Sequence, residues 1–324
     1  MNVLDESVAR EAREMLSREL HPTPLVLSST LSHSNKQVFL KLESALPTGS
    51  FKIRGALYAL WKKLKAERIT EVVASSTGNH GAAAAFAANR FGVPATIFLP
   101  RNPNPVKRRK IAALSATIIE EGQDLAEAHR AAVQYCLVHG RYFLDDATDP
   151  DIPVGTATIA YEIIEQMNAV DEIYVPMGDT ALIRGVAAAA KAANPEIRIV
   201  GVQAERAPAY YLSWQSGRVI CTEPPNTIAD GLATREPLSA SVAMIRRLVD
   251  DIRLVTEEQM LMAIRHLILE EHVVAEAAGA ATTAAYLMGD RRSESRNTVL
   301  VFSGANISPK VLADAVRMGD PGGR

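Results

Sequence analysis

From Glu71 onward, the sequence alternates short β-branched runs with longer alanine-rich segments. The apolar runs have the length of buried strands, and the segments between them carry the spacing and the end signals of helices. In this first series we expect strands at 71–75, 94–100, 117–122 and 141–145, and helices at 81–92, 105–116 and 124–140. This alternation is typical of a parallel sheet with crossover helices, so it predicts an α/β fold.

A second alternating series follows the turn-rich segment at 145–156. It predicts strands at 172–178, 198–204, 251–255 and 298–305, and helices at 181–194 and 256–272. Thr256 and Gln259 have the Thr-x-x-Gln spacing of a capping box at the start of the second of these helices. The sequence therefore predicts two lobes, each with its own open, mostly parallel twisted sheet flanked by helices.

The composition favours a protein that acts on small molecules. The chain of 324 residues is 48% hydrophobic, which is enough to bury a large core in two lobes. Its net charge of -2 creates no field that would attract nucleic acid or an anionic membrane. Two cysteines are too few for a disulfide framework, and no apolar run approaches the roughly 20 residues of a membrane-spanning helix. With a polar N-terminus in place of a signal peptide, these features indicate a cytoplasmic protein without a membrane role.

Three turns, at 75–81, 176–185 and 302–308, follow predicted strands and open helices. Such turns expose backbone N–H groups at a helix N-terminus, where the dipole favours a phosphate or a carboxylate. In open α/β sheets, ligands collect at this end of the strands. The first two turns do not match Gly-x-Gly-x-x-Gly, and no Gly-Lys-Ser/Thr follows at Walker spacing, which disfavours NAD and ATP.

Lys52 lies between a Thr48-Gly49-Ser50 turn and an amphipathic helical segment. Desolvation and neighbouring positive helix ends would both disfavour its ammonium form, which makes a free amine available. A reactive amine, together with turns that bind a phosphate and a carboxylate, suits a Schiff base to pyridoxal 5'-phosphate with an amino acid as substrate.

These motifs resemble the fold-type II pyridoxal phosphate enzymes, in particular the threonine dehydratase and serine racemase group. The matching segments run in the family's order and cover almost the whole chain: "PTGSFKIRGA", "SSTGNHG", "PMGDTALIRG", "TIADGLA", "LVDDIRLVTEEQM" and "VFSGANIS". The resemblance implies a tryptophan synthase β-like fold. It also implies a large cofactor-binding domain at 1–62 and 149–324, and a small substrate-closing domain at 63–148.

The resemblance also assigns roles to residues. Lys52 would form the aldimine and move the α-proton, Phe51 would flank the cofactor ring, and Ser303 would face the pyridine nitrogen. Asn79 would bond to the phenolic oxygen. The cofactor phosphate would be held at Gly178, Asp179, Thr180 and Ala181, and the substrate at Ser76, Thr77, Gly78, Asn79 and His80. Among the substrate residues, His80 is expected to shape the turn, while Thr77 has a catalytic role.

Three departures from the family pattern bear on these roles. The family's dehydratases usually have four glycines where this chain has 178–181, and Asp179 would repel a phosphate unless it points away or Arg184 offsets its charge. We expect Arg184 to be a solvated helix residue. Thr77 replaces the serine of serine racemases, which argues against racemisation. Tyr211 stands where the second carboxylate of a cation site is expected beside Glu205, so we expect no metal.

The resemblance implies an ammonia-lyase that converts L-threonine or L-serine to a 2-oxo acid and ammonia. Three alternatives stay open: a serine or threonine racemase, a dehydratase of a less common β-hydroxy amino acid, and a pyridoxal phosphate-binding protein without turnover. The family also suggests a homodimer.

Overall fold

The computed structural model of the protein describes residues 5–33, 35–76, 78–103, 105–167, 169–289 and 295–318. The chain divides into two compact units. Unit 1 contains Pro22–Ala45 and the residues from Ile159 onward, and unit 2 contains Asp5–His21 and Leu46–Thr158. Helix α6 (Ile152–Gln166) continues the chain from unit 2 into unit 1.

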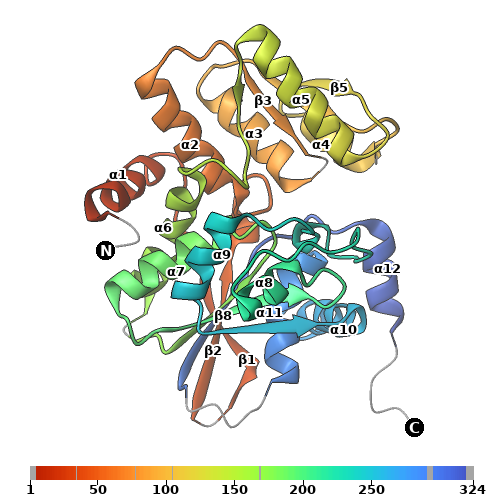
Figure 1. Cartoon of the computed structure of the whole chain (residues 1–324). Helices are drawn as coiled ribbons and strands as arrows, with labels where there is room; N and C mark the ends of the chain where they lie inside the picture. Colours follow the sequence, from red (N-terminus) through yellow and green to blue (C-terminus); the bar gives the residue numbers. More distant parts are fainter. Residues whose placement is uncertain are drawn as a thin grey trace. The chain divides into compact units, whose positions relative to one another are not determined.

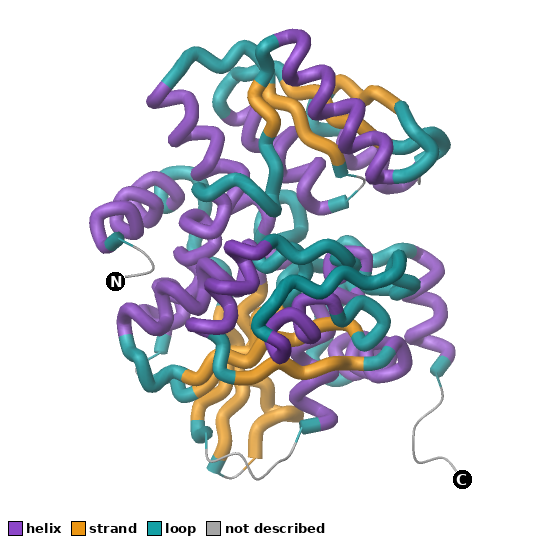
Figure 2. Tube along the Cα trace, in the orientation of Figure 1, coloured by secondary structure: helices purple, strands orange, loops and turns teal. Residues whose placement is uncertain are grey.

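Unit 1 is built on a six-stranded sheet with the order β1-β2-β10-β7-β8-β9, flanked by helices (Figures 1 and 2). β1 is antiparallel to β2, and the other neighbouring pairs are parallel. The strands are β1 (Leu25–His33), β2 (Lys36–Leu42), β7 (Glu172–Pro176), β8 (Arg198–Ala204), β9 (Asp251–Val255) and β10 (Asn297–Phe302). The helices are η1 (Glu43–Ala45), α7 (Ala181–Ala193), α8 (Ala209–Ser216), η2 (Asp230–Leu232), α9 (Ser239–Leu248), α10 (Glu257–Leu269), α11 (Ala277–Met288) and α12 (Pro309–Arg317).

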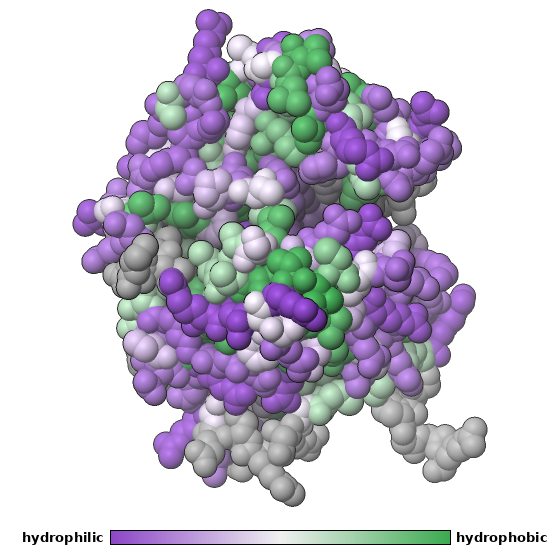
Figure 3. Space-filling view, viewed as in Figure 1, coloured by the Kyte–Doolittle hydropathy of each residue, from purple (hydrophilic) through white to green (hydrophobic). Residues whose placement is uncertain are grey.

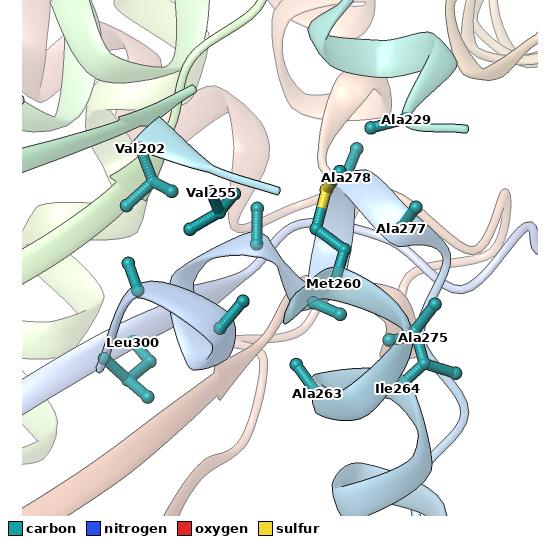
Figure 4. Packing of buried hydrophobic residues seen from close by; sticks show 14 of the residues in the cluster. Val202, Ala229, Val255, Met260, Ala263, Ile264, Ala275, Ala277, Ala278 and Leu300 are labelled. Carbon is teal, nitrogen blue, oxygen red and sulfur yellow. The ribbon is translucent and has the colours of Figure 1, made fainter. Parts of the chain in front are cut away.

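Different helices cover the two faces of this sheet, because side chains alternate along each strand. Val200 and Val202 of β8 belong to an alanine-rich core with α10 and α11, which Figure 4 shows from close by. Gly201 lies between them, and a Cβ there would meet Ile183 of α7. Helix α7 therefore packs on the opposite face from α10 and α11.

Unit 2 contains a four-stranded parallel sheet with the order β5-β4-β3-β6. Its strands are β3 (Val72–Ser75), β4 (Ala95–Leu99), β5 (Thr117–Glu120) and β6 (Tyr142–Phe143). Its helices are α1 (Glu6–Leu16), α2 (Lys52–Ala66), α3 (Asn79–Arg90), α4 (Pro105–Ala112) and α5 (Leu125–His139). A Cβ at Gly81 of α3 would touch Ile97, whereas the next strand residue, Phe98, joins a buried cluster with Ala132 and Cys136 of α5. The helices α3 and α5 thus cover opposite faces.

Each sheet has a switch point, where the chain leaves a central strand in one direction and later returns on its other side. In unit 1, β8 and β9 lie on one side of β7, and β10 lies on the other. In unit 2, β4 and β5 lie on one side of β3, and β6 lies on the other. Ligands of open α/β sheets bind outside the carboxyl ends of the strands at such points. The loops after β7 and β10, and those after β3 and β6, are therefore candidate ligand sites.

The predicted fold class is confirmed, and the strands and helices of both alternating series are present within a few residues of their expected bounds. The strands β1 and β2 were not anticipated, and the segment interpreted as turn-rich ends inside α6. The expected small domain, 63–148, lies within unit 2. This unit is larger and also includes α2, because α2 packs against α3. Which part of the chain closes over a substrate stays a prediction.

The surface is mostly polar on the face drawn in Figure 3, where smaller apolar areas interrupt the hydrophilic side chains. Among the described residues, no helix combines the length and the apolar character that crossing a membrane requires.

Candidate functional site

Lys52 is the first residue of α2, and its amine lies against the loop that follows β6. Gly49 precedes it with a φ of +72°, in the left-handed region that favours glycine, so the chain can turn sharply before the helix begins. The Nζ atom of Lys52 donates to Oδ2 of Asp146 at 2.5 Å. Both side chains are largely but not fully buried, with 12% and 22% exposed. Phe51 is buried, and the centre of its ring is 5.3 Å from the Lys52 Nζ.

The loop after β3 carries the predicted substrate residues. The Gly78 N–H donates to Ser76 Oγ at 3.2 Å, which leaves the hydroxyl proton of Ser76 available for a ligand. A Cβ at Gly81 would lie 2.5 Å from the carbonyl oxygen of Ser76, so this tight turn requires a glycine. Asn79 begins α3 and is half-buried. Thr77, predicted to act on the substrate, lies outside the described residues.

His80 connects the loop after β3 with the loop after β6. Its side chain is buried, and its Nε2 is 2.8 Å from the carbonyl oxygen of Leu144. Its Nδ1 is 3.7 Å from Oδ2 of Asp146, the same oxygen that Lys52 contacts. The structure therefore brings Lys52, His80 and Asp146 together at the switch point of unit 2. The role of His80 in shaping the turn stays a prediction.

In unit 1, the turn between β7 and α7 is tightly constrained at the predicted phosphate residues. A Cβ at Gly178 would lie 2.1 Å from the carbonyl oxygen of Gly231, so only glycine fits. Thr180 has a φ of +74°, an unusual conformation for a β-branched residue. Its Oγ1 is buried without a hydrogen-bond partner among the described residues. Such strain and unsatisfied polar atoms concentrate at ligand sites.

Asp179 points back onto the helix that follows it. Its Oδ1 accepts a hydrogen bond from the Ala181 N–H at 2.9 Å, and this N–H is one of the predicted phosphate donors. The expectation that Arg184 is solvated is wrong, because this residue is half-buried in α7. Burial lowers the pKa of the Arg184 guanidinium, while the charge of Asp179 acts in the opposite direction. Arg184 is thus near enough to offset the carboxylate charge beside the turn.

Ser303 follows β10 directly and is buried, at the same sheet edge as the turn after β7. The start of α11 packs against this loop, since the Glu276 N–H donates to the Gly304 carbonyl oxygen at 3.2 Å. A Cβ at Gly279 would lie 2.3 Å from that same oxygen. The switch point of unit 1 therefore brings together Ser303 and the predicted phosphate turn.

Glu205 and Tyr211 occupy the two positions at which a cation site was considered from the sequence. The Glu205 N–H donates to Val255, and the Tyr211 hydroxyl accepts from Gln215 Nε2 at 2.7 Å. In the part of the chain that the structure describes, no three His, Cys, Asp or Glu side chains are grouped to hold a metal ion.

Comparison with known proteins identifies the family. A model of the family described as "Pyridoxal-phosphate dependent enzyme" matches residues 16–304. The chain belongs to the pyridoxal-phosphate dependent enzymes. Its cofactor is pyridoxal 5'-phosphate, as predicted.

Relatives within the pyridoxal-phosphate dependent enzymes extend over nearly the whole chain. An L-threonine ammonia-lyase of Thermotoga maritima is 37% identical over 96% of this chain and 77% of its own length. A catabolic L-threonine dehydratase of Escherichia coli is 34% identical over 92% and 91%. Among solved structures, maize serine racemase has a TM-score of 0.90 at 30% identity and covers 97% of each chain. A threonine deaminase from T.th. has a TM-score of 0.88 at 30% identity, covering 94% of this chain and 99% of that one.

The residues present fit the cofactor of the pyridoxal-phosphate dependent enzymes. The turn at 178–181 offers backbone N–H groups at the start of α7 and the buried Thr180 hydroxyl, which has no hydrogen-bond partner among the described residues, and both features suit a phosphate. Lys52 offers a partly exposed amine. The residue that the sequence prediction missed is Asp146. Its signal was present, because Asp145 ends the predicted strand at 141–145 and Asp146 follows it directly, at the carboxyl end of a parallel strand where ligands bind.

Proposed function

We propose that the protein is an ammonia-lyase that dehydrates and deaminates a β-hydroxy amino acid, L-threonine or L-serine, to a 2-oxo acid and ammonia. The observation that carries this proposal is the 37% identity with the L-threonine ammonia-lyase of Thermotoga maritima along 96% of the chain. The geometry of each unit supports it. The Lys52 amine lies at the switch point of unit 2, and a turn suited to binding a phosphate, at 178–181, lies at the switch point of unit 1.

In this proposal, residues of unit 1 bind the phosphate and the ring nitrogen of the cofactor. When bound, pyridoxal phosphate supplies an aldehyde that reacts with amines and a ring that withdraws electrons from the substrate's α-carbon. The backbone of Gly178 to Ala181 and the Thr180 hydroxyl bind the phosphate, and the Ser303 hydroxyl bonds to the ring nitrogen. A neutral serine at that position does not force the ring to be protonated.

The residues of unit 2 bind the substrate and move protons. Lys52 Nζ carries the cofactor and takes the proton from the α-carbon of the substrate. The Ser76 hydroxyl, Thr77 and the N–H groups of Gly78 to His80 bind the substrate carboxylate at the start of α3, where the helix dipole favours an anion. Asn79 bonds to the phenolic oxygen of the cofactor, whose ring Phe51 flanks.

One assay tests the reaction. The holoenzyme is incubated with a panel of β-hydroxy amino acids, and oxo acid, ammonia and enantiomeric purity are measured in the same samples. We expect equal amounts of oxo acid and ammonia from L-threonine or L-serine, and none from Lys52→Ala. Borohydride reduction should link the cofactor to the peptide that contains Lys52. Turnover confined to an unusual β-hydroxy amino acid would change the substrate, and absence of turnover across the panel would contradict the proposal.

The second candidate is a serine racemase, which the likeness to maize serine racemase favours. The same assay separates the two, because a racemase scrambles the enantiomers without releasing a matching amount of ammonia. The threonine at position 77 argues against this candidate, since its methyl group restricts χ1.

We also infer a cytoplasmic homodimer. Cys136 and Cys221 are both free, which suits a reducing compartment. The resemblance to the family suggests the dimer, and light scattering of the purified holoenzyme would test it by giving twice the chain mass of 35.0 kDa.

A further inference from the structure

Asp145 and Asp146 follow β6 as neighbours but have different surroundings. Asp145 closes its own turn, accepting from the Ala147 N–H at 3.1 Å and from the Thr148 hydroxyl at 2.7 Å. Asp146 instead directs Oδ2 to the Lys52 amine at 2.5 Å. A short, charge-assisted hydrogen bond to a largely buried amine is a strong interaction. Of these two carboxylates, Asp146 is thus the one positioned to exchange a proton with Lys52.

His80 provides a second proton-binding atom beside Asp146. The carbonyl oxygen of Leu144 can only accept, so the proton of a neutral His80 ring must be on Nε2, at 2.8 Å from that oxygen. This leaves Nδ1 with a lone pair that faces Asp146 Oδ2 at 3.7 Å. Two such atoms repel unless a proton lies on one of them. Nδ1 of His80 therefore lies beside the oxygen that would receive a proton from Lys52.

We propose that Asp146 is the acid–base partner of Lys52, backed by Nδ1 of His80; this inference rests on the proposed function, in which Lys52 carries the cofactor. Lys52 is useful as a nucleophile and as a base only when its amine is neutral. The ammonium of Lys52 loses one proton and the carboxylate of Asp146 gains it, so the pair passes from two opposite charges to two neutral groups. The same exchange removes the proton that Lys52 takes from a substrate. Asp146 acts through Lys52 and is a positioning residue for it.

The test follows the uptake of pyridoxal phosphate by the apoprotein, which requires a neutral Lys52 amine and needs no turnover. Uptake is timed by stopped-flow from the visible absorbance of the bound cofactor. We expect Asp146→Asn to slow uptake by roughly 100-fold, the size of an acid–base contribution. Asp145→Asn is the matched control and should take up cofactor at a rate close to that of the unchanged protein. Thermal unfolding of both apoproteins shows whether the variants fold.

Chemical rescue separates proton transfer from a structural role. Adding acetate should restore uptake in Asp146→Gly, where it can replace the missing carboxylate, and should leave Asp145→Gly unaffected. Unchanged or faster uptake by Asp146→Asn would overturn the proposal, because the carboxylate would then only hold the ammonium. Equal slowing in both aspartate variants without rescue would also overturn it. A protein that takes up cofactor but forms no oxo acid refutes the proposed function alone, and the uptake comparison still decides the role of Asp146.

Discussion

At the scale of single residues, neighbouring positions in the two ligand loops have opposite tasks. Asp145 closes a turn while Asp146 faces an amine. Asp179 accepts a hydrogen bond from the Ala181 N–H, while the buried Thr180 hydroxyl has no partner among the described residues. A sequence pattern identifies such a loop, because it follows a strand and opens a helix. It cannot say which of two adjacent side chains turns inward, since that choice depends on backbone angles and on tertiary neighbours. For this reason Lys52 was predicted from the sequence and Asp146 was not.

The backbone strain at Thr180 should lower stability, while its hydroxyl contributes to cofactor binding. The left-handed conformation costs a residue with a side chain about 1–2 kcal/mol, whereas glycine adopts it freely but loses about 0.4–1 kcal/mol of unfolded-state advantage. Thr180→Gly should therefore raise the free energy of unfolding of the apoprotein by up to about 1 kcal/mol in urea titrations. Exposed Ser115, with a φ of +63°, is the control, and Ser115→Gly should give a similar gain. Only Thr180→Gly should weaken binding of the cofactor; a loss of stability in Thr180→Gly would contradict the strain argument.

Glu172 should make stability fall as pH rises. It is buried in β7, and this burial raises its pKa from 4.5 despite the charges of Arg198 and Arg253. Between 4.5 and the raised value, the folded state holds more protons than the unfolded state, so the free energy of unfolding decreases with pH across that window. Glu172→Gln cannot titrate and lacks this decrease. The free energy of unfolding of Glu172→Gln minus that of the unchanged protein, measured in urea, should therefore increase with pH above 4.5 and then level off. A decrease of this difference would mean that the pairing with Arg198 dominates.

At the scale of elements, sequence motifs predicted those helix ends that are fixed by contacts between residues close in the chain. The capping box at Thr256 is present as expected. The Thr256 Oγ1 accepts from the Gln259 N–H at 3.2 Å, and the Gln259 Oε1 accepts from the Thr256 N–H at 2.9 Å. Helix α6 was missed because Pro153 and Gly155 read as turn residues. In the structure, Gly155 lies inside α6, where a Cβ would be 2.5 Å from the Arg54 carbonyl oxygen. The glycine therefore allows α6 and α2 to pack closely.

Gly155→Ala should therefore destabilise the protein, against the rule for helices. In an exposed helix, alanine would be favoured over glycine by about 1 kcal/mol. Here the added methyl group meets backbone atoms of α2, and overpacking of this kind costs about 1–3 kcal/mol. We expect a net loss of stability of up to about 2 kcal/mol in urea titrations. A more stable variant would show that α2 can move away from α6 at little cost.

At the scale of the whole molecule, the two sheets repeat one design. In each sheet, the residues predicted to bind ligands lie at the carboxyl ends of the strands beside its own switch point, and the alternating series in the sequence predicted both sheets. Helix α2 precedes the first series in the sequence, and its packing on α1 and α3 places it in unit 2, which no local sequence pattern indicates. The predicted tasks divide accordingly: the aldehyde chemistry belongs to Lys52 in unit 2 and the phosphate binding to the 178–181 turn in unit 1.

This division predicts how ligands that lack one group stabilise the protein. A ligand that binds only the folded state raises stability with the ratio of its concentration to its Kd, by about 2.7 kcal/mol at 100 times Kd. Pyridoxal phosphate should raise the Tm of the apoprotein more than pyridoxal, which lacks the phosphate, or pyridoxine phosphate, which lacks the aldehyde. In Lys52→Ala, pyridoxal phosphate should no longer raise the Tm more than pyridoxine phosphate, but it should still raise it more than pyridoxal. In Thr180→Ala, the difference in Tm rise between pyridoxal phosphate and pyridoxal should shrink, and the difference from pyridoxine phosphate should stay the same. If either variant removed both advantages equally while its apoprotein Tm stayed unchanged, Lys52 and the 178–181 turn would not bind separate groups of the cofactor.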